Sequence, residues 1–250
     1  MGPSRREHED HAHGQPIPLV ELPCTCKPQD NIQRARFPVG KTVEGRCGAA
    51  MSFARAGSLT TMGKLTYGMN VSVDGYIADA NGGIEWTGPP DDELHQYWND
   101  REREIAVALY GRRLYDLMSA YWPTADQDPA ATPITVDFAR VWREMPKVVF
   151  SRTLESVDWN SRLERGDVVE VATRLKAETD GLLEVAGATL AAPLVRAGLV
   201  DEFRIVVIPT AVGGGTPFFP ELPSRIPLRL IETRTFRGGT VLLRYEAVRD

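Results

Sequence analysis

The sequence is poor in cysteine, and its three cysteines, Cys24, Cys26 and Cys47, all lie in the first fifth of the chain. A disulfide framework therefore cannot hold the remainder together, and its core must be stabilised by packing. No apolar run approaches the roughly 20 residues that a membrane-spanning helix needs, and the first residues lack the apolar centre of a secretory signal. We expect a cytoplasmic protein with no membrane partner.

Positive charge is not in excess either. The 250 residues include 29 lysines and arginines against 34 aspartates and glutamates, which gives a net charge of −5 at pH 7. This balance argues against a nucleic-acid partner, whose phosphates attract basic surfaces. Hydrophobic residues make up 42% of the chain, which is enough for a globular core.

Periodic hydrophobic patterning is absent from residues 1–61, which are rich in proline, glycine, arginine and histidine. We therefore expect a disordered N-terminal extension over 1–61 and one folded domain over 62–250. The histidines and cysteines of the extension do not follow the spacing of a zinc site, so no metal is predicted.

The folded domain begins with a predicted strand, because every second residue from Leu65 to Val73 is apolar. Apolar runs at 104–111, 146–151 and 181–187, each bounded by breakers, then indicate buried parallel strands. The predicted helices cover 91–103, 112–118, 135–143, 172–179 and 188–197, and later strands cover 201–212, 228–236 and 240–248. This order predicts an α/β fold with a mostly parallel central sheet, flanking helices and an antiparallel C-terminal edge.

The Gly-x-Gly-x-x-Gly fingerprint of dinucleotide-binding folds is also missing. The glycine-rich stretch VGGGTPF at 212–218 contains Pro217, so no helix opens there to receive a phosphate. We expect a tight loop or bulge near the site, and a standard Rossmann fold is excluded.

Three strand-to-helix junctions offer a different phosphate chemistry. Ligands of open α/β sheets bind beyond the carboxyl ends of the strands, where helix N-termini present free N–H groups. Two of the junctions carry arginine, whose guanidinium matches phosphate oxygens. The candidate cofactor-binding residues there are Gly111 and Arg112, then Ser151, Arg152 and Thr153, and finally Gly187, Ala188, Thr189 and Leu190. Together they suit a dinucleotide with a pyrophosphate and one additional phosphate.

The first junction lies in the stretch LYGRRLYD, where Arg112 and Arg113 stand together at a predicted helix start. A positive side chain is unfavourable there unless an anion binds. We expect Arg112 to face the phosphate and Arg113 to pair with a surface carboxylate. At the second junction, Ser151 or Thr153 is also placed to cap a turn.

The motifs MNVSVDGYIAD, LYGRRLYD, KVVFSRTL and VAGATLAAPLVRAGLVDEFRIVVIPTAVGGGTPFF occur in this order in the chain. They resemble the dihydrofolate-reductase-like family, and most closely its branch with the C-terminal reductase domain of the bifunctional riboflavin-biosynthesis deaminase-reductase. The resemblance covers about 64–248. The zinc signature of the deaminase half has no counterpart upstream.

The resemblance implies NADPH as the cofactor, because an arginine at position 152 would meet the phosphate on the adenosine ribose. The loop that starts at Ser72 would frame the nicotinamide and the substrate. A homodimer with its interface on the C-terminal strands is also implied. One departure is Val185, which precedes Ala186 and Gly187 where the family commonly has a glutamate or two glycines, so we expect the substrate contacts to differ.

Three carboxylates, Asp74, Asp91 and Asp92, are candidate catalytic or substrate-binding groups. The last two follow Trp86 by five and six residues, where the dihydrofolate reductases place a substrate-binding carboxylate. Asp91 is equally well placed to cap a helix, and Asp74 to form a turn with the next glycine. The structural interpretation is favoured for both.

The function implied is an NADPH-dependent reductase of a pyrimidine or pterin-like small molecule. The reaction is expected to be most like the reduction of 5-amino-6-(5-phosphoribosylamino)uracil in riboflavin biosynthesis. Dihydrofolate reduction is an alternative, and a nucleotide-binding protein that keeps the fold without turnover is another.

Overall fold

A computed structural model describes residues 62–88 and 91–249. The extension predicted over 1–61 lies outside these residues. Within the part that is described, no helix combines the length and the apolar character needed to cross a membrane.

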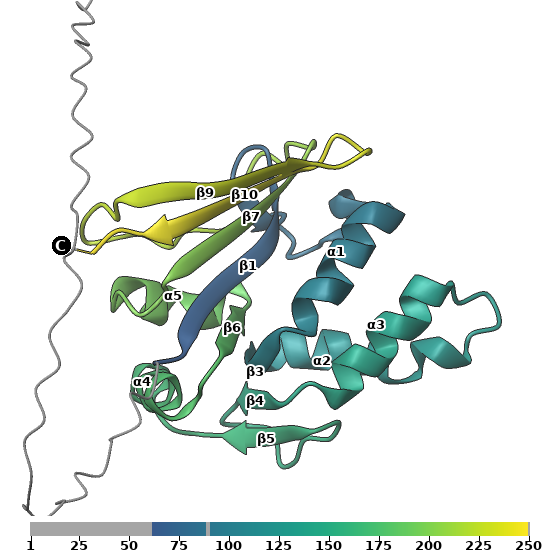
Figure 1. Cartoon of the computed structure of the whole chain (residues 1–250), viewed down its shortest axis with the longest axis horizontal. Helices are drawn as coiled ribbons and strands as arrows, with labels where there is room; N and C mark the ends of the chain where they lie inside the picture. Colours follow the sequence, from purple (N-terminus) through teal and green to yellow (C-terminus); the bar gives the residue numbers. More distant parts are fainter. Residues whose placement is uncertain (1–61, 89–90, 250) are drawn as a thin grey trace, which may run out of the picture. The chain divides into compact units, whose positions relative to one another are not determined.

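One eight-stranded sheet forms the centre of the domain, with the order β5-β4-β3-β6-β1-β7-β10-β9 (Figure 1). Its strands are β1 (Lys64–Ser72), β3 (Ile105–Gly111), β4 (Lys147–Phe150), β5 (Ser161–Glu164), β6 (Leu182–Ala186), β7 (Glu202–Ile208), β9 (Leu228–Thr235) and β10 (Val241–Ala247). The first six strands of this order are parallel, whereas β10 runs antiparallel to both β7 and β9. The predicted parallel sheet with an antiparallel C-terminal edge is therefore confirmed.

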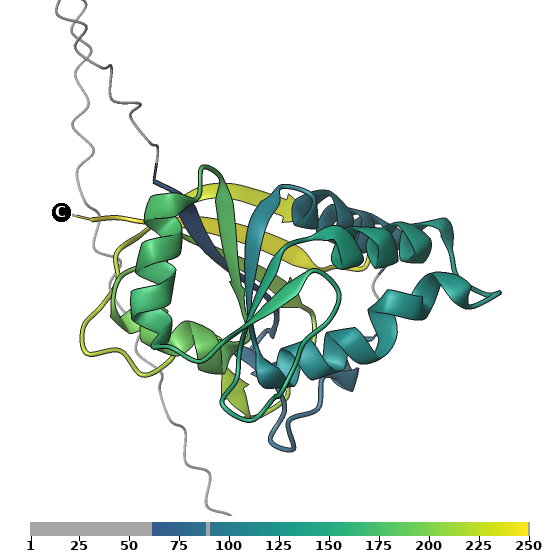
Figure 2. The same cartoon turned by 90° about the horizontal axis from the view of Figure 1, so that it is seen from below.

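Helices cover both faces of this sheet. They are α1 (Asp92–Glu102), α2 (Arg112–Tyr121), α3 (Pro133–Glu144), α4 (Val168–Glu178) and α5 (Ala188–Arg196), with short 3₁₀ turns at Glu85–Thr87 and Trp122–Gln127. Figures 1 and 2 show α4 and α5 together on one side of the sheet and α1, α2 and α3 on the other. This layering is the α/β arrangement that the alternation of strands and helices predicts.

Strand β1 shows why the sheet has two different faces. Leu65 and Tyr67 are fully buried in the larger core cluster, with Leu175 of α4 and Leu194 of α5. Thr66 points the other way, because successive side chains of a strand alternate between faces. On that second face the sheet is apolar toward the carboxyl ends of the strands and charged toward their amino ends.

One helix start and one strand are the main differences from the sequence prediction. Helix α4 begins at Val168, earlier than the predicted 172, because the Asp167 carboxylate accepts hydrogen bonds from the N–H groups of Val169 and Glu170 at 2.9 and 3.1 Å. Strand β5 was not predicted, since its sequence SRLE is mostly polar. It forms by pairing with β4 at the edge of the sheet.

The charged half of the second face contains a buried carboxyl group, that of Glu184 in β6. Its side chain is 4% exposed and accepts a hydrogen bond from Thr66 Oγ1 at 3.3 Å. Burial raises the pKa of Glu184 to about 7, which the charge of Arg101 only partly opposes. The folded protein therefore holds a proton that the unfolded chain loses near pH 4.5.

This proton predicts how stability depends on pH. The contribution of Glu184 to stability is full below about pH 4.5 and is lost as the pH rises through about 7. Glu184→Gln should remove that loss, so the variant should become more stable than the wild type toward pH 8, by on the order of 2 kcal/mol. Urea unfolding between pH 5 and 8 measures the difference, and the exposed Glu178→Gln is the matched control. A constant difference across that range would contradict the prediction.

Candidate active site

Two neighbouring parallel strands, β3 and β6, each end where a helix begins. Tyr110 pairs in register with Ala186, so the next residues, Gly111 and Gly187, lie at the same edge of the sheet. Gly111 is the N-cap of α2 and Gly187 is the N-cap of α5. The N-termini of two helices therefore open side by side at the carboxyl ends of the strands.

These two helix starts differ from the other α-helices of the described chain. In α1, α3 and α4 the N-cap side chains of Asp91, Thr132 and Asp167 accept backbone N–H hydrogen bonds. Helices α2 and α5 have neither a side-chain cap nor an acidic residue in the first turn. Their first N–H groups are therefore available to an anion, which their helix dipoles also favour.

The two helix starts face each other across their N-cap glycines. Gly187 has a φ of +91°, a conformation that side chains disfavour. A Cβ placed on Gly187 would lie 4.0 Å from Leu114, and one on Gly111 would lie 3.7 Å from the Cβ of Leu190. Each glycine thus faces the first turns of the other helix.

The remaining candidate residues, in the first turn of α5, offer a ligand mainly their backbone N–H groups. Ala188 is buried, Leu190 packs against the larger core cluster, and only Thr189 is exposed. The backbone N–H groups of this turn, together with the Thr189 hydroxyl, are therefore the groups that a ligand at this edge could use.

The loop after β4 is the second predicted junction. Ser151 is 8% exposed, and its Oγ accepts hydrogen bonds from the N–H groups of Thr153 and Leu154 at 3.2 and 3.1 Å. Ser151 thus caps this turn, as one of the two alternatives from the sequence predicts. Arg152 and Thr153 are exposed.

Arg112 connects this loop to α2. Its Nη1 donates to Thr153 Oγ1 at 2.7 Å, and its Nε lies 3.2 Å from the carboxylate of Asp116. The expectation that Arg113 rather than Arg112 pairs with a carboxylate is therefore wrong, because the i,i+4 spacing on α2 favours the pair of Arg112 with Asp116. The bond to Thr153 brings the first and second junctions together.

Arg165 also belongs to this corner, although sequence reasoning missed it. It follows β5 directly and donates from Nη1 to the carbonyl of Ser151 at 3.3 Å and from Nη2 to that of Leu154 at 2.7 Å. It thereby adds a second guanidinium to the loop that carries Arg152. The pairing of β4 with β5 brings Arg165 next to this loop, and the polar sequence of β5 does not indicate that pairing.

At the end of β1, Asp74 holds the glycine-rich loop. The Oδ1 atom of Asp74 accepts from the N–H of Val212 at 3.1 Å, and its Oδ2 accepts from the N–H of Gly213 at 2.7 Å. A hydrogen bond from the Ser72 side chain, followed by these backbone bonds, lowers the pKa of Asp74. Ser72 itself is buried and accepts from the N–H of Tyr76 at 3.0 Å. Both residues therefore order the loop after β1.

The tight loop predicted for the glycine-rich stretch is present. The three successive glycines, Gly213, Gly214 and Gly215, all have positive φ. The loop leads into β8 (Thr216–Pro217), which pairs antiparallel with β2 (Tyr76–Ala78). The β1–β2 segment and the glycine-rich loop thus form one unit at the carboxyl end of β1.

The carboxylate of Asp91 is engaged in the same structural way as that of Asp74. Its Oδ1 accepts from the N–H of Leu94 at 2.7 Å, and its Oδ2 accepts from the N–H of Gly238 in the β9–β10 turn at 3.0 Å. These bonds, the one from Leu94 first, lower its pKa. The capping interpretation is confirmed, whereas a substrate-binding role for Asp91 stays a prediction. Asp92 is exposed in the first turn of α1.

The aromatic residues near α1 belong to the core. Trp86, Tyr97 and Trp98 pack against a buried cluster that includes Leu94 and Phe236. His95 lies 5.9 Å from the ring of Trp122 and 5.8 Å from that of Phe138 between centroids, and burial lowers its pKa. His95 is therefore a helix-packing contact.

The model of the RibD C-terminal domain matches residues 63–242 of the chain. The chain belongs to the RibD C-terminal domain family. A relative of this RibD-type domain, the uncharacterized protein YyaP of Bacillus subtilis, is 32% identical over 177 residues, which cover 70% of this chain and 90% of YyaP.

Solved structures show the same fold. RibD of Acinetobacter baumannii aligns with a TM-score of 0.54 and 16% identity over 76% of this chain and 59% of its own. Dihydrofolate reductase of Enterococcus faecalis, solved with NADP(H), aligns with a TM-score of 0.51 and 15% identity over 74% of this chain and 97% of its own. The dihydrofolate-reductase-like fold predicted for this RibD-type domain is therefore confirmed.

The glycine-rich loop of this RibD-type domain makes a prediction about stability. A Cβ on Gly215 would lie 2.0 Å from the carbonyl oxygen of Ala78, whereas one on Gly213 would meet nothing within 4 Å. Both glycines have positive φ, so either alanine variant should lose about 1–2 kcal/mol from backbone strain. Gly215→Ala should lose a further 1–3 kcal/mol or so, because the backbone of β2 must shift. Urea unfolding of both variants tests this, and equal losses would contradict it.

Proposed function

We propose that the protein is an NADPH-dependent reductase of a pyrimidine or pterin-like heterocycle, most like the reductase that acts on 5-amino-6-(5-phosphoribosylamino)uracil. One observation carries the proposal: the N-termini of α2 and α5 open side by side and lack the caps of the other helices. Membership of the RibD C-terminal domain family supports the reductase class. The NADP(H) bound to the Enterococcus faecalis dihydrofolate reductase supports the choice of cofactor.

The residues at this edge fit a dinucleotide. The free N–H groups that follow Gly111 and Gly187 suit a pyrophosphate, because two helix dipoles and several donors converge on one anion. Arg152 and Arg165, on the adjacent loop, suit the additional phosphate of NADPH. The cofactor supplies the hydride, and the protein's part is to hold the nicotinamide and the substrate together and to exclude water.

For the substrate, we assign the polar contact to Asp92. Both carboxylate oxygens of Asp91 and of Asp74 already accept backbone hydrogen bonds, whereas the side chain of Asp92 is exposed at the start of α1. Dihydrofolate reduction would use a carboxylate at the same place, so substrate panels of both kinds are needed. A protein that binds NADPH and oxidises it with neither kind of substrate would be the nucleotide-binding alternative.

A homodimer stays a prediction as well. Strand β9 lies at the edge of the sheet, and its side chains Leu230 and Ile231 are exposed. An exposed apolar edge strand is a common place for two chains to pair.

The cofactor proposal predicts a preference for NADPH over NADH that depends on Arg152. Arg152→Ala should weaken NADPH binding by about 10- to 100-fold, because a charge-assisted contact to the phosphate is lost, and should leave NADH binding unchanged. Fluorescence titration of both cofactors measures these affinities.

The control for this experiment is Arg140→Ala, which removes another exposed arginine, from α3. It should change neither affinity. If NADPH is not preferred by the wild type, or if Arg152→Ala leaves the preference intact, the phosphate assignment is wrong.

The substrate proposal predicts different effects at the two neighbouring aspartates. Asp92→Asn should lower kcat/KM by about tenfold or more, because a charged hydrogen bond to the substrate is lost, with a melting temperature close to that of the wild type. Asp91→Ala should instead lower the free energy of unfolding by about 1 kcal/mol, as expected for a lost helix cap. Full activity of Asp92→Asn on every substrate tested would exclude Asp92 from substrate binding.

A further inference from the structure

A second candidate site lies at the opposite end of the sheet from Gly111 and Gly187. An open cavity of about 590 Å³ lies between α1 and the strands β1, β6, β7, β9 and β10. Lys64, Leu182 and Glu202, which line it, are the first residues of β1, β6 and β7. The cavity therefore opens at the amino ends of the parallel strands, away from the proposed cofactor site.

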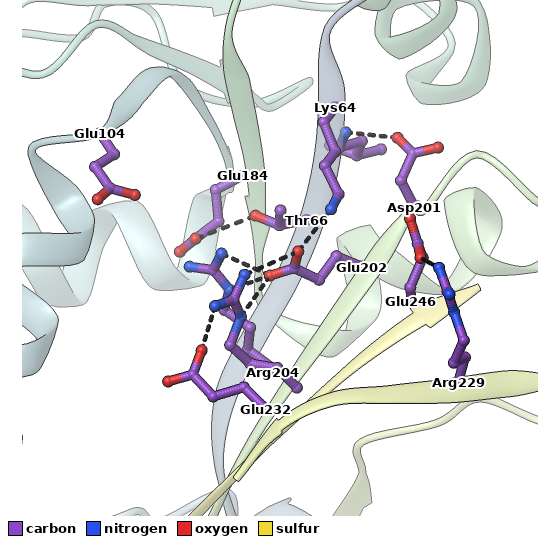
Figure 3. A network of polar contacts seen from close by, with 12 residues as sticks. Lys64, Thr66, Glu104, Glu184, Asp201, Glu202, Arg204, Arg229, Glu232 and Glu246 are labelled. Atoms are coloured by element: carbon purple, nitrogen blue, oxygen red, sulfur yellow. Dashed lines mark hydrogen bonds and ion pairs between the residues drawn. The ribbon is translucent and has the colours of Figure 1, made fainter. Parts of the chain in front are cut away.

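Glu202 is the centre of an ion network in this cavity (Figure 3). Its buried carboxylate accepts from Lys64 Nζ at 2.8 Å, from Arg204 Nε at 2.6 Å and from Arg244 Nε at 3.0 Å. Three cations around one carboxylate leave its oxygens saturated. Although burial opposes it, the hydrogen bonds from Arg244 and Lys64 lower the pKa of Glu202.

The other acidic residues of the cavity wall are paired as well. These pairs are Glu93 with Arg234, Asp100 with Arg103, Glu104 with Arg101, and Glu232 with Arg244. Each of these acids therefore already has a cationic partner, and none of them needs a further cation for charge neutralisation.

Some hydrogen-bond donors of the wall, in contrast, have no partner. Arg101 and Arg204 are 6% and 2% exposed. Nε and Nη2 of Arg101, Nη1 of Arg204 and the hydroxyl of Tyr97 are all buried without a hydrogen-bond partner among the described residues, and all three residues line the cavity. Among the described residues, no carboxylate oxygen of the cavity wall is buried without a hydrogen-bond partner.

The unmet hydrogen bonds of the cavity are therefore on the donor side. A buried guanidinium N–H without an acceptor is unfavourable, and guanidinium groups match oxyanions better than they match water. Glu184 is close enough to Arg101 to interact with it electrostatically, but its hydrogen bond comes from Thr66 Oγ1. The volume of about 590 Å³ leaves room for a small ligand beside these donors.

We propose that this cavity binds a small oxyanion, of the phosphate or carboxylate type, between Arg101 of α1 and Arg204 of β7. Tyr97 supplies an additional hydrogen bond from α1. The site would tie α1 to the sheet through the ligand, and it is separate from the dinucleotide edge.

Inorganic phosphate is the first probe. Its affinity for the full chain, measured from the rise in melting temperature with concentration, should fall by about 10- to 100-fold in Arg101→Gln. Tyr97→Phe should also weaken phosphate binding, yet it should not destabilise the phosphate-free protein, because it removes only a hydroxyl that has no partner. A purely structural role of these residues would not produce that combination.

Two matched arginine variants separate this site from other sources of phosphate binding. Arg140→Gln removes an exposed arginine of α3, and Arg229→Gln removes an exposed arginine of β9. Both should retain the phosphate response that Arg101→Gln loses. This outcome does not depend on whether the protein binds NADPH. If Arg101→Gln and Tyr97→Phe respond to phosphate like the wild type, the proposal is overturned.

A crystal soaked with tungstate provides the direct test, because this oxyanion scatters strongly enough to be located. Tungstate between Arg101 and Arg204 would support the proposal, and malonate in place of tungstate would show whether a carboxylate ligand also fits. Ordered water alone at the three donor groups, with the tungstate elsewhere or absent, would overturn it.

Discussion

The parallel pairing of β6 with β3 on one side and with β1 on the other is the constraint on which both ends of the domain depend. Parallel strands share one carboxyl edge, so the helices that follow β3 and β6 must begin next to each other. The pairing of Tyr110 with Ala186 fixes that position to the residue. Glycine then follows at both strands, and each glycine lies beside the first turn of the other helix.

Local sequence patterns could predict the strands and helices that this pairing joins. They could not predict every neighbouring strand or the contacts between residues far apart in the chain. The buried strands and the helices on either side of Gly111 and Gly187 are visible as apolar runs and helical periods. Strand β5 is not, because a polar edge strand takes its structure from the pairing with β4. The position of Arg165 was unpredictable for the same reason. The role of Asp74 depends on Gly213, which lies 139 residues further along the chain, and no local pattern contains that contact.

The same pairing gathers charged residues at the amino edge, where sequence reasoning predicted no site. Asp201 and Glu202 are adjacent in the sequence, yet their side chains have different partners. Asp201 binds Lys176 at 2.5 Å, whereas Glu202 faces the cavity. The partners of Glu202 come from β1, β7 and β10. Such a network becomes visible only when the strand order is known, because its members are far apart in the chain.

The two edges therefore present donors of different kinds. At the carboxyl edge, the donors are backbone N–H groups at the helix starts, which carry no net charge and whose direction depends on the path of the chain around two glycines. At the amino edge the donors are guanidinium groups held by ion pairs, and their direction depends on those pairs remaining intact. Helix α1 belongs to the amino edge, since Arg101 in its last turn lines the cavity, while Asp91 at its start binds the β9–β10 turn. Leu94 packs α1 onto the sheet in one buried cluster with Val206 of β7 and Leu242 of β10.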